Sequence, residues 1–160
     1  MDRNDFSVTV AGFKIRFDYA LIMIHGTPGE DGRMQGYLDM MGVSYSSCDM
    51  VSTVITFDKL ACKRAVSGAG VNLAREVSLR TGEKFDSADI AAKLGLPLFV
   101  KPNASGSSFG VTKVKSVVEI GPAVEAAFRE SDMVLLEEFV DGREVACGLM
   151  ISRDGVETVF

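Results

Sequence analysis

The chain has 160 residues, of which 47% are hydrophobic and 24% are charged. This composition is close to that of globular proteins, and the length suffices for one core or two small ones. The 17 basic and 22 acidic residues give a net charge of -5 without a lysine or arginine cluster, which argues against nucleic acid as a partner.

No apolar run approaches the roughly 20 residues that cross a membrane, and the beginning MDRNDFSV lacks the regions of a secretory signal. We therefore expect no membrane partner and a cytoplasmic location. Cys48, Cys62 and Cys147 lack CxxC spacing, so the sequence predicts neither a disulfide framework nor a zinc site. The single histidine, His25, excludes a metal site built from several histidines of this chain.

The first strands are predicted from two patterns. SVTVAGFKIRF contains two alternating runs around Ala11 and Gly12, which is typical of a β-hairpin. YALIMI, residues 19–24, is an uninterrupted apolar run of the kind found in a buried central strand.

A glycine-rich loop, HGTPGEDG, precedes the first predicted helix. In RMQGYLDMMG the apolar residues recur at helical spacing, and Gly42 is the expected stop. They are Met34, Tyr37, Leu38 and Met41. A strand, a polar loop and a helix in this order often build a site, because the loop lies beside the helix N-terminus.

Residues 50–66, MVSTVITFDKLACKRAV, allow two interpretations. One is a strand up to Phe57 followed by a helix, and the other is a single helix from about Val51 to Val66. The β-branched residues favour the first. A domain boundary is expected here, with residues 1–52 in one unit and 53–160 in the next.

The second half alternates strands and helices. VNLAREVSLRTGE reads as short extended pieces. DSADIAAKLG is a predicted helix with Asp86 or Ser87 as its cap and Gly95 as its stop, and Pro97 opens the strand PLFVK.

SVVEIGPAVEAAFRE begins with Ser116 and Glu119 in capping-box spacing, and its Gly121–Pro122 step predicts a kink or a restart at Ala123. Further strands are expected in MVLLEEF and REVACGLMIS, and RDGVETVF is expected to turn into a last strand.

Chemistry is concentrated in FVKPNASGSSFGVTKV, which resembles neither a P-loop nor a Rossmann fingerprint. Two strands flank a tip of small residues. Gly106 and Gly110 permit close backbone approach, Ser107 and Ser108 supply hydroxyl donors, and Lys101 supplies positive charge. These features suit phosphate oxygens, although the loop alone does not separate this reading from a flexible hairpin without a ligand.

A second group of candidates lies in LLEEFVDGRE. A strand end that continues into a connecting segment can offer backbone groups to a purine, with Phe139 or Val140 as an apolar wall and a later carboxylate for ribose hydroxyls. For Glu137 and Glu138 alone, a solvated strand end is the simpler interpretation.

Together these segments resemble the D-alanine:D-alanine ligase family of the ATP-grasp superfamily, from about Tyr19 to Met150. The patterns HGxxGEDGxxQG and VKPxxxGSSxGV carry the resemblance. It implies that ATP phosphorylates the carboxylate of one D-alanine and that the amine of a second attacks the acyl phosphate, giving the dipeptide of peptidoglycan. The implied fold class is α/β and α+β: the remainder of a parallel α/β domain, then a central ATP-grasp subdomain with an antiparallel sheet and helices.

By resemblance, Lys59 and Lys101 would bind the ATP phosphates, and the GSS hairpin would close over the nucleotide. Ser107 would orient a hydrogen-bond network at the substrate, and Ser108 would face the phosphates.

The resemblance also assigns a base and ribose site. Glu137, Glu138, Phe139 and Val140 would line the adenine pocket, and Glu144 would accept hydrogen bonds from the ribose hydroxyls.

His25 would lie near the carboxylate of the first substrate. Glu30 and Asp31 are interpreted as residues that shape the loop. Lys63 and Arg64 are interpreted as a solvated helix face.

Two departures from the family pattern shape the expectations. A glycine-rich N-terminal strand and loop with its glutamate has no counterpart in MDRNDFSV, and the region that supplies the Mg²⁺ ligands in the family lies beyond Phe160. We therefore expect the 160 residues to be inactive alone, with apolar surface near LLEEF and the last strands that favours homodimerisation. Another ATP-grasp carboxylate-amine ligase and a non-catalytic ATP-binding module remain alternatives.

Overall fold

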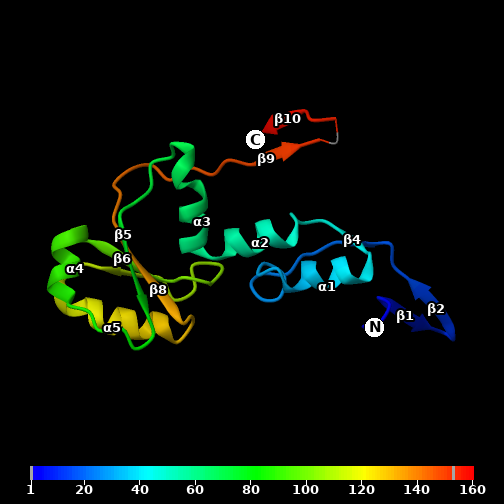
Figure 1. Cartoon of the computed structure of the whole chain (residues 1–160), viewed down its shortest axis with the longest axis horizontal. Coiled ribbons are helices and arrows are strands. Elements are labelled where there is room, and N and C mark those ends of the chain that lie inside the picture. The colour runs from blue at the N-terminus through cyan, green and yellow to red at the C-terminus, as the bar shows by residue number, and fades with distance from the viewer. Residues whose placement is uncertain (1, 153) are drawn as a thin grey trace.

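The computed structural model describes residues 2–152 and 154–160. Figure 1 shows an extended arrangement in three parts, with an N-terminal hairpin at one end, helices in the middle and a helix-covered sheet at the other end. The C-terminal hairpin stands apart from the sheet at the end of a long connecting segment.

The N-terminal hairpin confirms the sequence prediction. Strands β1 (Ser7–Val10) and β2 (Phe13–Arg16) pair antiparallel through a two-residue loop of Ala11 and Gly12. Both loop residues have positive φ, 50° and 83°. This is the backbone that matches the twist of a two-residue hairpin.

A small parallel unit follows. Strands β3 (Tyr19–Ala20) and β4 (Ser44–Tyr45) pair in parallel, and the helix α1 (Arg33–Met41) connects them. Helix α1 ends as predicted at Gly42, which is left-handed with φ 66°.

The buried central strand predicted over residues 19–24 is wrong beyond Ala20. Leu21 is 72% exposed and Met23 is 82% exposed. Within the described part of the chain, β3 pairs only with the two-residue β4. An apolar run forms a central strand only where neighbours cover both its edges and its faces.

Residues 50–66 form two helices. The favoured prediction of a strand up to Phe57 is therefore wrong, and the single-helix alternative is nearer to the observed structure. Helix α2 (Met50–Phe57) and helix α3 (Lys59–Val66) meet at Asp58, and a short 3-10 turn, η1 (Ser67–Ala69), follows. The expected domain division at residues 52 and 53 falls inside α2.

Local hydrogen bonds explain why β-branched residues are helical in α2. Asp49 caps the first turn by accepting a hydrogen bond from the Ser52 N–H at 2.9 Å. The hydroxyls of Thr53 and Thr56 donate to the carbonyls of Asp49 and Ser52, one turn earlier, at 2.9 and 2.8 Å. These contacts satisfy the threonine hydroxyls within the helix.

Four antiparallel strands form the main sheet in the order β5-β8-β6-β7. Their bounds are β5 (Glu76–Arg80), β6 (Leu98–Pro102), β7 (Thr112–Val114) and β8 (Met133–Glu138). The pairing of β6 with β7 confirms that the serine- and glycine-rich segment is a hairpin tip.

Helices α4 (Ser87–Leu94) and α5 (Val117–Phe128) pack against one face of this sheet (Figure 1). As predicted, Asp86 caps α4 and Gly95 ends it. Helix α5 runs without interruption through Pro122, so the predicted restart at Ala123 is wrong. Burial of the α5 face that carries Ile120 and Val124, 0% and 1% exposed, stabilises the helix across the proline.

The predicted strand over residues 143–152 is confined to β9 (Leu149–Ile151), which pairs with β10 (Glu157–Val159). The predicted turn includes residue 153, which lies outside the described residues. Apolar surface is exposed on this hairpin, where Phe160 is 76% accessible. Near LLEEF, Leu135 and Leu136 are fully buried, and exposed apolar surface is found at Val140, 66% accessible. Among the described helices, none has the length and apolarity of a membrane span.

Candidate functional site

The two faces of the main sheet differ in chemistry because side chains alternate along each strand. On β6, Leu98, Val100 and Pro102 are buried under the helices. Phe99 and Lys101 therefore lie on the opposite face. The register pairs Phe99 with Glu137 of β8, which places this carboxylate on the same face.

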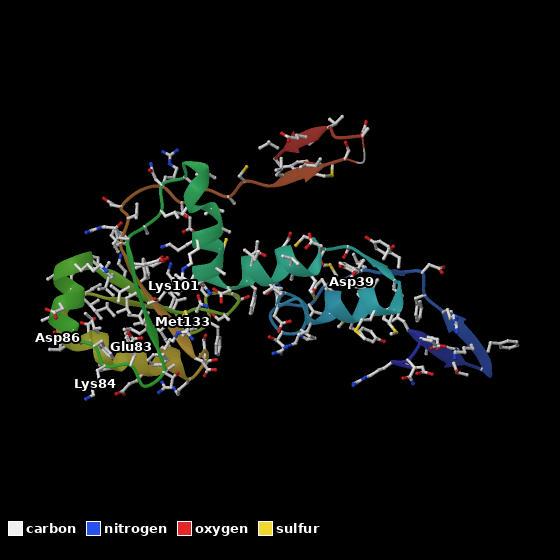
Figure 2. The ribbon with its side chains drawn as sticks, viewed as in Figure 1. Asp39, Glu83, Lys84, Asp86, Lys101 and Met133 are labelled. Carbon is white, nitrogen blue, oxygen red and sulfur yellow. The ribbon has the colours of Figure 1, made fainter. Side chains whose placement is uncertain are left out.

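A cavity of about 550 Å³ opens on the polar face. It is lined by Lys59, Phe99, Lys101, Ser105, Ser107, Ser108, Val111 and Glu144. Figure 2 shows Lys101 beside the N-terminal end of α3. Residues far apart in the sequence thus share one hollow of the size that small ligands occupy.

Lys59 reaches the cavity because a cap fixes the start of α3. Asp58 accepts a hydrogen bond from the Ala61 N–H at 2.8 Å. The Lys59 Nζ donates to the carbonyls of Ser105 at 2.8 Å and Asn103 at 3.3 Å. Burial lowers the pKa of Lys59, and repulsion from Lys101 lowers it further. A ligand with negative charge would relieve this repulsion.

The hairpin tip contains two non-glycine residues with positive φ. Ser107 and Ser108 are both left-handed, with φ of 49° and 55°. Non-glycine residues adopt this conformation at a cost, and such strain is concentrated at functional sites. Gly110 has φ 73°, and a Cβ there would lie 2.7 Å from the Cγ of Pro102. Glycine is therefore required where the tip returns to β7.

Four charged side chains form a network that includes Lys101 of the cavity wall. Lys101 contacts Glu137, whose other oxygen accepts a hydrogen bond from Lys63 at 2.8 Å. Lys63 also contacts Glu76. Burial acts to raise the pKa of Glu137, but hydrogen bonds from Lys101 and Lys63 outweigh burial and hold the pKa below its usual value.

Burial and hydrogen bonding also oppose each other at Lys63, where each shifts the pKa in the direction opposite to its effect on Glu137. Burial acts to lower the pKa of Lys63, yet hydrogen bonds to Glu137 and Glu76 raise it overall. Interpreting Lys63 as solvated is therefore wrong, since its side chain is 15% exposed. Arg64 is exposed, as expected.

The residues predicted to line the adenine pocket lie in different environments. Glu138 follows Glu137 on β8 and so points to the other side, where it accepts hydrogen bonds from the Arg75 N–H at 2.7 Å and Nε at 2.6 Å. Phe139 lies 6.1 Å from Phe99, centroid to centroid. Val140 is 66% exposed.

The ammonium group of Lys113 lies over the ring of Phe139. The Lys113 Nζ lies 3.6 Å from the centroid of this ring and 5.7 Å from that of Phe99. This arrangement is a cation–π contact. It gives the polar face an aromatic border next to the cavity.

His25 does not line the cavity. Its side chain is 88% exposed, with Nδ1 3.5 Å from the Glu30 Oε1. The other oxygen of Glu30 accepts a hydrogen bond from the Gly26 N–H at 2.6 Å, which confirms a loop-shaping role. A Cβ on Gly106 would lie 3.1 Å from this carboxylate, so the hairpin tip and the loop are adjacent.

A second cavity of about 380 Å³ adjoins the first through Lys59 and Ser105. Gln35 forms part of its wall and is fully buried. The Gln35 Nε2 donates to the Gly29 carbonyl at 2.8 Å and to the Ser47 Oγ at 2.9 Å. This side chain thus joins the glycine-rich loop to the segment before α2.

Sequence reasoning missed three contributors to the site. Asn103, 3% exposed, accepts a hydrogen bond from the Leu60 N–H through its Oδ1 at 2.9 Å and so joins the hairpin to α3. The pattern VKPxxxGSSxGV leaves position 103 open, so the motif gave no signal for this contact. Glu76 and Lys63 offered none, because their contacts join distant strands and helices.

The donors around the cavity fit a polyphosphate. Two ammonium groups and serine hydroxyls provide the charge and hydrogen bonds that phosphate oxygens require. The fit to Mg²⁺ is different. Within residues 2–152 and 154–160 no group of three metal-ligating side chains occurs. The carboxylates of Glu76 and Glu137 are already engaged by lysines, so the residues present do not form a magnesium site.

Comparison with known proteins supports one family. Residues 66–159 match the family model described as "D-ala D-ala ligase C-terminus". The chain is 51% identical over 160 residues to a D-alanine–D-alanine ligase of Parabacteroides distasonis and 49% identical over 160 residues to one of Phocaeicola vulgatus. It covers 48% and 49% of these proteins, respectively.

Comparison with solved structures leads to the same family. D-alanyl-alanine synthetase A of Vibrio cholerae superposes with a TM-score of 0.87 at 27% identity, over 99% of this chain and 48% of the other. The VanG D-Ala:D-Ser ligase of Enterococcus faecalis gives 0.82 at 32% identity, over 99% and 46%. The chain thus spans about half the length of the relatives that it matches. Because the family model covers most of its residues, the chain belongs to the D-alanine–D-alanine ligase C-terminal family.

Proposed function

We propose that this chain contributes the nucleotide side of an ATP-dependent ligase that joins two D-alanines for peptidoglycan synthesis. ATP supplies a phosphoryl group to the carboxylate of one D-alanine, with release of ADP. The amine of a second D-alanine attacks the acyl carbon, the C–O bond to phosphate breaks, and the amine loses a proton. Activation is needed because a free carboxylate has a poor leaving group.

In this proposal Lys59 and Lys101 hold the ATP phosphates. Both lysines line the same cavity, and Lys101 stands on β6, which is paired on both sides with β8 and β7. Fixed positive charges of this kind stabilise the negative charge that moves between oxygens during phosphoryl transfer. The lowered pKa of Lys59 reflects burial and the nearby Lys101, so the bound anion would restore charge balance.

The hairpin tip is proposed to cover the phosphates. Ser108 would donate a hydrogen bond to a phosphate oxygen, and Ser107 would orient the substrate side. The short distance between Gly106 and Glu30 favours the second role, because a Cβ on Gly106 would lie 3.1 Å from the Glu30 carboxylate and the tip therefore lies next to the glycine-rich loop. On the same grounds His25, beside Glu30, is proposed to donate to the carboxylate of the first D-alanine.

The base is proposed to lie between Phe99 and the segment from Glu137 to Val140, with Glu144 accepting hydrogen bonds from the ribose hydroxyls. Glu144 borders the same cavity as the lysines. Glu138 would contribute through its backbone, because its side chain is bound to Arg75.

We further propose two functional units, residues 1–52 on the substrate side and 53–160 on the nucleotide side. The proposed partners are D-alanine and ATP, in the cytoplasm. A second copy of the chain is the proposed cover for the exposed apolar residues of β9 and β10, such as Leu149 and Ile151. Sedimentation at increasing concentration tests this last point, and a monomer at every concentration would contradict it.

The observation that carries the proposal is the shared cavity of Lys59 and Lys101. Isothermal titration of the 160-residue chain with ATP is expected to show saturable binding. Lys101→Ala is expected to weaken it by about ten-fold or more, since a charged contact to phosphate is lost. Lys84→Ala, an exposed lysine between β5 and α4, is the matched control and should bind as the unchanged chain does.

A chain that is folded by circular dichroism but shows no saturable ATP binding would contradict the nucleotide site. Ligation itself is tested in a chimaera in which these residues replace the matching segment of the Parabacteroides distasonis ligase. D-alanine-dependent phosphate release is expected, and Lys101→Ala should abolish it. A folded chimaera that binds ATP without D-alanine-dependent release would contradict the proposed substrate and leave the nucleotide site intact.

A further inference from the structure

Lys63 lies between two carboxylates that face each other across the sheet. The β5–β8 register places Glu76 directly opposite Glu137. The Lys63 Nζ contacts both and also donates to the Ala74 carbonyl at 2.7 Å. The side chains of Lys63, Glu76 and Glu137 are 15%, 24% and 12% exposed, so water screens their charges weakly.

Glu137 divides its two oxygens between two lysines. Oε1 accepts a hydrogen bond from Lys63, and Oε2 contacts Lys101. Lys101 therefore faces a carboxylate on one side and the cavity on the other. Its position depends on how strongly Glu137 attracts it.

The four charges balance as they stand. Two ammonium groups, on Lys63 and Lys101, offset two carboxylates, on Glu76 and Glu137. Without Lys63, two opposed carboxylates would share Lys101 alone. Carboxylates directly opposite each other on a sheet repel, and a remaining cation is drawn toward both.

We propose that Lys63 is a positioning residue for the nucleotide site: it neutralises the facing carboxylates so that Lys101 remains available to the phosphates. The inference rests on the proposed function for the identity of the ligand. Lys63 does not line the cavity of Lys101, so it acts through Glu137 and not by touching the nucleotide.

The neighbouring basic residue provides a control for this role. Arg64 follows Lys63 on α3 and is exposed, and within the described part of the chain it forms no ion pair. A general need for positive charge on this helix would not distinguish the two positions. The predicted effect therefore belongs to Lys63 and not to its neighbour.

Charge balance makes a prediction that packing does not. Lys63→Met keeps much of the side-chain volume but leaves one lysine for two carboxylates, and we expect ATP affinity to fall by about ten-fold or more. Adding Glu76→Gln removes the excess negative charge. The double variant should bind ATP within about three-fold of the unchanged chain, as a coupled pair does in a double-mutant cycle.

Controls define the comparison. Arg64→Met should leave ATP affinity unchanged, and Lys63→Arg should retain most of it because the charge is kept. The proposal is overturned if Lys63→Met binds ATP as the unchanged chain does. It is equally overturned if Glu76→Gln fails to restore binding in the double variant, because Lys63 would then act by packing or by direct contact.

A ligand-free measurement separates this inference from the proposed function. The charged groups that face Glu137 are Lys63 from α3, Lys101 from β6 and Glu76 from β5, with Lys59 close enough to feel its charge. In a ¹³C NMR titration, Lys63→Met should raise the pKa of the Glu137 carboxyl, and Glu76→Gln should lower it again. If ATP fails to bind the unchanged chain, the proposed function fails, while an unmoved Glu137 titration overturns the role of Lys63.

Discussion

The two faces of the β5-β8-β6-β7 sheet are built from the same strands, but one packs against helices and the other carries charged side chains beside a cavity. One face presents aliphatic side chains to α4 and α5, where Leu98, Val100 and Leu136 are fully buried. The other presents Lys101 and Glu137, with a cavity above them. The first face packs the sheet against the helices, and the same strands carry the charges of the second face.

The difference between the faces follows from a period of two along each strand. On β8 the change occurs between neighbours, since Leu136 belongs to the core and Glu137 to the polar face. A substitution on the apolar face should therefore change mainly stability, and a substitution on the polar face should change mainly binding. The following predictions test this separation.

The largest effect is expected for Leu98→Ala. Leu98 is fully buried in the cluster with Ile120 and Val124, and truncation leaves a cavity that the helices cannot close. We expect a loss of about 3 kcal/mol in the free energy of unfolding. Denaturant titration measures it, and a loss below about 1 kcal/mol would show that the helices do not pack as described.

The next effect concerns the tip of the hairpin. Gly110→Ala introduces a Cβ at φ 73° that lies 2.7 Å from Pro102, so both backbone strain and overlap oppose it. We expect about 2 kcal/mol of destabilisation. Gly82→Ala is the matched control, because Gly82 has φ 82° but no atom within 4 Å of the new Cβ. Equal losses for the two variants in thermal unfolding would contradict the close approach to Pro102.

A smaller effect is expected at the cap of α4. The Asp86 carboxylate, labelled in Figure 2, accepts hydrogen bonds from the N–H groups of Ala88 at 2.7 Å and Asp89 at 3.2 Å. Asp86→Ala should cost about 1 kcal/mol, and Asp86→Asn should cost less because asparagine also caps helices. ATP affinity should not change, since the cap serves the apolar face. Chemical denaturation and calorimetry check the two statements separately.

The smallest effect is a pH dependence from the polar face. The pKa of Glu137 is lowered from 4.5 in the folded chain, so the stabilisation it provides is present above that value and lost as the pH falls through the folded pKa. The stability difference between the unchanged chain and Glu137→Gln should therefore be greatest near neutral pH and should shrink below about 4.5. A difference that stays constant from pH 7 to pH 3 would contradict the ion pairs.

Much of this architecture was predictable from local patterns. The helix that ends at Gly42, the helix between Asp86 and Gly95 and the hairpin of β6 and β7 were all predicted, because caps, stops and turn residues act over a few positions. The common cavity of Lys59 and Lys101 matches the expectation from motif resemblance.

The errors lie where distant residues or competing local bonds decide. Helix α2 was predicted as a strand from its β-branched residues, but the Asp49 cap and the threonine hydroxyl bonds favour a helix. Lys63 was assigned to solvent, whereas Glu137, 74 positions away, engages it. No pattern within one segment reports such a contact, because the sheet must first bring β5 and β8 beside α3.

NMR mapping of ATP binding shows whether the polar face of the sheet holds the nucleotide. In an ATP titration of the ¹⁵N-labelled chain, we expect saturable shifts of the amides at Lys59, Lys101, Ser107, Ser108 and Glu144. Amides of α4 and α5 should remain unchanged. Shifts confined to the helices, or no saturable shift on the polar face of a folded chain, would mean that this face does not bind ATP.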